Sequence, residues 1–100
     1  MAINTGTAVG YSFLNITVAA PTTTVVKTGS GILHTITLNG PVATAVVTVY
    51  DNTAASGTAI AIITVPASPQ PVTLTFDAAF STGLTVVTAT AAQNVTVTFI

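Results

Sequence analysis

Few side chains in this sequence could do acid–base chemistry. Apart from two tyrosines, the titratable candidates are His34, Asp51, Asp77 and Lys27. Enzymes that transfer protons or form covalent intermediates combine several such groups, and neighbouring residues tune their pKa values. The serines in glycine-rich turns form no Gly-x-Ser-x-Gly motif, and no paired histidine accompanies them. We therefore expect no catalytic residues and no enzyme activity.

The single histidine is a poor candidate for a metal ligand. Zinc and transition-metal sites combine several His, Cys or carboxylate ligands, and this chain has one histidine and no cysteine. In an extended strand, His34 shares a face with Ile32 and Ile36. We expect a half-buried histidine whose ring nitrogens bond to the backbone or to threonine hydroxyls.

The two aspartates are most simply interpreted as loop caps. Asp51 follows a predicted strand and precedes Asn52, and such side chains bond to their own backbone in Asx turns. Asp77 is expected to open the loop before Phe80 in the same way. A calcium site is the alternative, but it needs several convergent carboxylates and only these two are present. We therefore expect no metal and no cofactor.

The composition limits the possible partners. Charged residues make up 3% of the chain and Lys27 is the only basic side chain besides the histidine, so the cluster of cations that nucleic-acid binding requires is absent. Half of the residues are hydrophobic, but threonine, asparagine, serine or glycine interrupts every apolar run well before the length of a membrane span. We expect neither a nucleic acid nor a membrane as partner.

The elements that must position these side chains are predicted to be β-strands. Alternating segments rich in Val, Ile and Thr, separated by Gly, Pro and Asn clusters, predict strands over residues 11–19, 22–27, 32–39, 42–50, 58–65, 72–76, 84–89 and 94–100. About eight short strands without any helical period predict an all-β, single-domain antiparallel β-sandwich over residues 11–100. Periodicity does not give the strand connections, which leaves jelly-roll and Ig-like orders open; we favour the jelly-roll.

The first ten residues do not follow the strand pattern. Residues 1–10 are uncharged and mostly small, which suits an extended N-terminal arm that becomes ordered on a partner, or a frayed terminus. They contain no basic residue and no sustained apolar run, so we do not expect a secretory signal.

Several predicted strands are apolar on both faces. The adjacent pairs are Ile32 with Leu33, Val46 with Val47, Ile62 with Ile63, and Val86 with Val87. One member of each pair must face the core, and the other can be buried by a neighbouring subunit. The alternative is that these pairs lie at the ends of the sandwich or under loops. Because so little charge is available to keep edges and faces apart, we favour assembly.

Four segments, residues 25–34, 49–58, 80–87 and 95–99, together resemble a recurrent β-module of tailed-bacteriophage virion proteins. That family comprises small accessory proteins of the head, of decoration, cement or head-fibre type. The resemblance spans residues 25–100 and leaves residues 1–24 outside. It implies a compact β-sandwich, attachment to a capsid lattice and no catalytic residues.

The resemblance therefore predicts a structural protein of the virion, at the capsid surface, which decorates or stabilises the head lattice. Its expected partners are the major capsid protein and further copies of itself, as a homotrimer. The residues expected at capsid or subunit contacts are Ile3, Val9, Tyr11, Phe13, Leu33, Val46 and Tyr50. Two other functions stay open: a fibre module that binds a host-surface glycan or receptor, for which Tyr11 and Tyr50 are the plausible aromatics, and an adhesin-type Ig-like domain.

Overall fold

A computed structural model describes residues 10–17, 22–89 and 93–100 of the chain. Its strands are β1 (Ser12–Ile16), β2 (Thr22–Thr28), β3 (Gly31–Gly40), β4 (Val46–Tyr50), β5 (Ala59–Thr64), β6 (Val72–Phe80), β7 (Gly83–Ala89) and β8 (Asn94–Phe99). Within these ranges there is no helix, and so none with the length and apolar character to cross a membrane.

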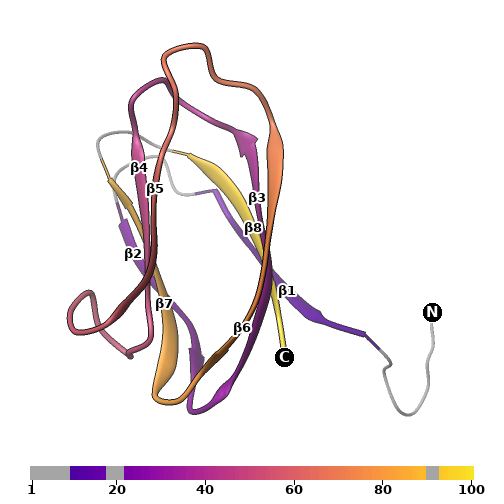
Figure 1. Ribbon diagram of the computed structural model, residues 1–100, viewed down its shortest axis with the longest axis vertical. Helices are drawn as coiled ribbons and strands as arrows, with labels where there is room; N and C mark the ends of the chain where they lie inside the picture. Colours follow the sequence, from indigo (N-terminus) through magenta and orange to yellow (C-terminus); the bar gives the residue numbers. More distant parts are fainter. Residues whose placement is uncertain (1–9, 18–21, 90–92) are drawn as a thin grey trace.

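The strands form two four-stranded antiparallel sheets that pack face to face (Figure 1). Sheet A has the order β1-β8-β3-β6, and sheet B has the order β2-β7-β4-β5. Each of the first four strands pairs with its counterpart from the other end of the chain: β1 with β8, β2 with β7, β3 with β6, and β4 with β5. A long hairpin folded over in this way is the double Greek key of a jelly roll. The predicted all-β sandwich and its jelly-roll order are thus confirmed.

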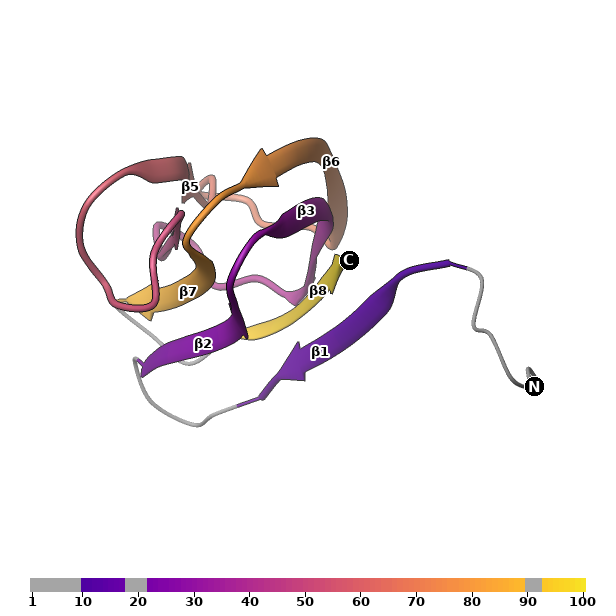
Figure 2. The same ribbon diagram turned by 90° about the horizontal axis from the view of Figure 1, so that it is seen from below.

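The core lies between the two sheets, as the view along the sandwich shows (Figure 2). Alternation places every second side chain there. Along β4 this puts Val47 and Val49 inside, and along β8 it puts Val95 and Val97 inside. Among the residues that the structure describes, the buried apolar side chains are Ile16, Leu33, Ile36, Leu38, Ala45, Val47, Val49, Val65, Phe80, Leu84, Val86, Val95 and Val97.

Most strand boundaries lie within three residues of the predicted ones, but two of them differ by four residues. Strand β4 begins at Val46 rather than at residue 42, because residues 43 and 44 form a turn in which Thr44 has a φ of 63° and donates its backbone N–H to Val65. Strand β6 continues to Phe80 rather than ending at Phe76. The continuation passes through an irregularity that redirects several side chains.

That irregularity is a β-bulge shared by three strands of sheet A. At His34, β3 carries one residue more than β8 beside it, while β6 carries two residues, Phe76 and Asp77, opposite the same position. The extra residue shifts the alternation of β3, so that Leu33 before the bulge and Ile36 after it are both fully buried. Bulges of this kind change the direction of a side chain and increase the local twist.

Candidate functional site

The bulge brings together an aromatic side chain, an imidazole and a carboxylate. The Nδ1 atom of His34 lies 2.5 Å from Oδ1 of Asp77, on the neighbouring strand. Because an ionised carboxylate only accepts hydrogen bonds, Nδ1 of His34 carries the proton and donates it. The ring of Tyr11, just before β1, stacks on the imidazole with 3.9 Å between centroids and 7° between planes. We call Tyr11, His34 and Asp77 the His34 cluster.

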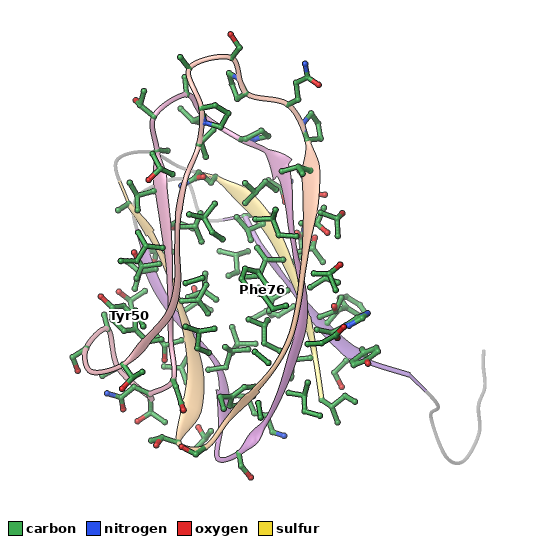
Figure 3. All side chains as sticks on the ribbon, viewed as in Figure 1. Tyr50 and Phe76 are labelled. Carbon is green, nitrogen blue, oxygen red and sulfur yellow. The ribbon has the colours of Figure 1, made fainter. Side chains whose placement is uncertain are left out.

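The backbone under this cluster is strained at one residue. Asp77 has a φ of 48°, in the left-handed region, which most non-glycine residues avoid and which aspartate and asparagine tolerate best. Phe76 points between the sheets, where Figure 3 labels it, while the side chain of the neighbouring Asp77 is 56% exposed. Strain of this kind often accompanies binding sites.

Next to the His34 cluster, the outer face of sheet A is polar and uncharged. Its threonine and asparagine side chains bond to one another across the strands: Asn39 donates to Thr96 at 2.8 Å, and Thr96 donates to Asn15 at 2.9 Å. The hydroxyls of Thr35 and Thr98 lie 2.5 Å apart, and those of Thr37 and Thr73 lie 2.9 Å apart. We call this surface the Thr/Asn face; it comprises Asn15, Thr35, Thr37, Asn39, Thr73, Thr96 and Thr98.

The outer face of sheet B has a different character. One row of paired residues crosses all four of its strands, from Thr23 through Val87 and Thr48 to Ile62. Ile62 is 68% exposed, and the flanking rows add three further apolar side chains. We call this surface the aliphatic face; it comprises Val25, Val46, Tyr50, Ile62 and Val87. Figure 3 shows Tyr50 on the outside of the sheet, beside the β4–β5 loop.

The remaining carboxylate, Asp51, has a structural position at the end of β4. Its Oδ1 accepts hydrogen bonds from the backbone N–H groups of Thr82 at 2.9 Å and Ser81 at 3.0 Å, in the β6–β7 turn. The amide of Thr82, followed by that of Ser81, lowers the pKa of the Asp51 carboxyl below its usual value. Asp51 therefore joins two loops at one end of the sandwich.

The structure corrects the predicted local roles of the titratable residues. His34 does not share a face with Ile36, because the bulge turns the imidazole outward while Ile36 stays in the core, and its ring meets Asp77 and Tyr11. Asp77 does not open a loop but lies within β6. Asp51 does not form the expected Asx turn; Asn52 bonds to its own loop instead, since its Oδ1 accepts the N–H of Thr53 at 2.8 Å and its Nδ2 donates to the backbone oxygen of Ser56 at 2.8 Å.

The predicted contact residues fall on different surfaces. Tyr11 and Phe13 are exposed on the outer side of sheet A, with Phe13 74% exposed, and Val46 and Tyr50 are half-buried on the aliphatic face. The prediction for Leu33 is wrong: it is fully buried in the core, because the inward member of the Ile32–Leu33 pair is Leu33. Ile3 and Val9 lie outside the described residues, as do all residues of the predicted arm except Gly10.

The apolar pairs noted in the sequence separate as expected between the two sides of their sheets. Val47 and Val86 are buried, and their neighbours Val46 and Val87 lie on the aliphatic face. Ile63 packs against the core while Ile62 points outward. The His34 cluster, by contrast, was not predicted, since no local pattern in the sequence links its three members.

Among residues 10–17, 22–89 and 93–100, no three potential ligands of the His, Cys, Asp or Glu type come close enough to hold a metal ion. Comparisons of the chain with protein-family models, with curated proteins and with solved structures found no match.

Proposed function

We propose that this chain is a structural virion protein that binds the outer surface of a bacteriophage capsid and decorates or stabilises the head lattice without catalysis. The observation that carries the proposal is the aliphatic face, on which Ile62 is 68% exposed in a sheet surface that has no charged side chain in its paired rows. An apolar surface of this kind is typical of a protein interface.

The low charge of the chain supports a protein partner for this face. The net charge is −1, and only 3% of the residues are charged, whereas a free domain normally carries about a quarter. Repulsion between copies is correspondingly weak. We therefore propose that the aliphatic face contacts another subunit, in a homotrimer or against the major capsid protein.

In this proposal, attachment to a lattice also stabilises the folded domain. A domain of 100 residues without cysteines has no disulfide to limit its unfolded state. A partner that binds only the folded form shifts the equilibrium toward that form. A jelly roll is suited to this role because it buries one face of each sheet in its own core and leaves the other two faces for contacts.

The test uses light scattering and co-sedimentation with capsids that lack this protein. The wild-type chain should be a trimer and should sediment with the capsids. Ile62→Glu should weaken both properties, because it places a charge on the most exposed side chain of the aliphatic face. Thr75→Glu is the matched control, since Thr75 is exposed on the edge strand of the other sheet.

A monomeric wild-type chain without affinity for capsids would contradict the proposal. If the Ile62→Glu and Thr75→Glu proteins assemble and bind capsids equally well, the capsid is still the partner, but the aliphatic face is not the contact surface. Circular dichroism melts of each variant establish that it is folded before the assembly measurements are made.

A further inference from the structure

We propose that the outer side of sheet A is a binding site for neutral carbohydrate, with an aromatic platform formed by Tyr11 and Phe13 and polar contacts supplied by Asp77 and the Thr/Asn face. This proposal does not depend on capsid attachment, because it concerns the sheet opposite the aliphatic face.

The platform offers exposed aromatic surface on which a pyranose ring can pack. Sugars present a face of C–H groups that packs on the π-face of an aromatic ring, since the ring surface is electron-rich. One face of the Tyr11 ring stacks on the imidazole of His34 at a centroid distance of 3.9 Å, and Tyr11 is still 45% exposed. Phe13 lies two residues further along on the same side of β1 and is 74% exposed.

The exposure of Phe13 is unusual for its position. It pairs with Thr98 in the middle of a regular antiparallel ladder, where a threonine would serve as well and would not present a large apolar ring to water. Its neighbours on this face are polar: Thr98 lies directly opposite, and Asn15 follows two residues later. Exposed aromatic rings beside hydroxyls and amides favour an amphipathic ligand over an apolar protein surface.

The polar part of the site is already ordered. The hydrogen bond from Nδ1 of His34 holds the Asp77 carboxylate in place at Oδ1, while its 56% exposure leaves it open to accept hydrogen bonds from ligand hydroxyls. The threonine hydroxyls and asparagine amides beside it both donate and accept. Because cross-strand bonds fix these side chains, a sugar would bind with little further loss of side-chain freedom.

The charges determine the class of sugar. Sialic acids, uronates and sulfated sugars require cationic partners, and the one Lys or Arg in the chain, Lys27, lies on β2 of sheet B. The charged residue in the site is Asp77, which repels anions. The ligand class is therefore a neutral hexopyranose oligosaccharide or polysaccharide, and acidic glycans should be excluded.

In the first test, the full chain is applied to a glycan array. The array carries neutral gluco-, galacto- and manno-oligosaccharides beside sialylated, uronate-containing and sulfated ones. The dissociation constant for the neutral glycan with the strongest signal is then measured by calorimetry for the wild type and for Tyr11→Ala, Phe13→Ala and Ile62→Thr. Each aromatic substitution should weaken binding by roughly tenfold or more, since stacked rings dominate such contacts. Ile62→Thr, on the aliphatic face, should leave the affinity unchanged.

Three results would overturn the inference: no binding to any neutral glycan, stronger binding to acidic than to neutral glycans, or an affinity that both aromatic substitutions leave unchanged. The outcome is separable from the capsid test, because glycan binding should persist in the Ile62→Glu protein and capsid binding should persist in the Phe13→Ala protein.

Discussion

The carboxylate of Asp51 accepts the backbone N–H of Thr82 at a distance of 2.9 Å, across 31 positions in the sequence. This contact connects the end of β4 to the β6–β7 turn and thus links a strand of sheet B to the connection between the two sheets. Both oxygens of the carboxylate also accept the N–H of Ser81. One side chain therefore replaces the backbone partners that the turn lacks.

Replacing Asp51 by Asn should destabilise the fold. The substitution keeps the shape of the side chain but removes its charge and turns one acceptor into a donor that faces the N–H of Ser81. We expect the melting temperature at pH 7 to fall by roughly 5 °C, which is a usual response of a domain of this size to the loss of one such contact. Asp77→Asn, which leaves the turn intact, should change it less; equal losses would contradict a special role for Asp51.

The same contact predicts a dependence of stability on pH. The hydrogen bonds lower the pKa of Asp51 in the folded state below its ordinary value of 3.8, so its contribution is complete above that value. As the pH falls below 3.8 toward the lowered folded pKa, the unfolded chain takes up the proton first and the contribution is lost. Urea unfolding between pH 6 and about pH 2 should show this loss in the wild type and a flatter profile in Asp51→Asn; parallel profiles would refute it.

Gly83, at the start of β7, should not tolerate a side chain. A Cβ atom there would lie 2.7 Å from Cγ2 of Thr53 and 3.0 Å from the backbone oxygens of Asn52 and Lys27. Because two of these three neighbours are backbone atoms, Gly83→Ala should cost about 1–3 kcal/mol of unfolding free energy. Gly40→Ala is the control, since its Cβ would meet only Cβ of Asn94 at 3.6 Å. Denaturant titrations in which the two variants lose equal stability would contradict the close approach.

Truncation of the two neighbours Ile32 and Leu33 should destabilise the fold to very different extents. Leu33 is fully buried and Ile32 is 40% exposed. Leu33→Ala should therefore lower the unfolding free energy by about 2–5 kcal/mol, whereas Ile32→Ala should cost less than about 1 kcal/mol. Urea unfolding of both variants measures this difference. The reverse order would mean that β3 enters the bulge in the opposite register.

The regular part of the fold could be predicted from the sequence because alternation is a local property. In β4 and β8 the inward residues are those expected from period two, since Val47, Val49, Val95 and Val97 all lie in the core. The jelly-roll order was favoured rather than deduced, because it depends on pairing between strands far apart in the chain. The strand order of the two sheets in the structure shows this pairing.

The candidate site could not be predicted in the same way. His34 and Asp77 are 43 positions apart, and their contact requires a bulge at which two residues of β6 lie opposite His34 of β3. Alternation counted back from the buried Ile36 places His34 inside the core and so hides its contact with Tyr11. Asp51 was correctly singled out as a loop residue, but its partners lie in a turn about 30 positions away rather than in its own loop.

The left-handed backbone of Asp77 provides the last prediction. Its φ of 48° costs little for Asp, Asn or Gly but is strongly unfavourable for a β-branched residue. Asp77→Val should therefore lower the unfolding free energy by about 1–3 kcal/mol relative to Asp77→Asn. The control is Thr75→Val, on the same side of β6 and two residues earlier, where the strand is regular and the branched side chain suits it. Urea unfolding of the three variants measures the difference. If Thr75→Val lowers the unfolding free energy as much as Asp77→Val does, the exposed edge of sheet A, rather than the bulge, disfavours valine.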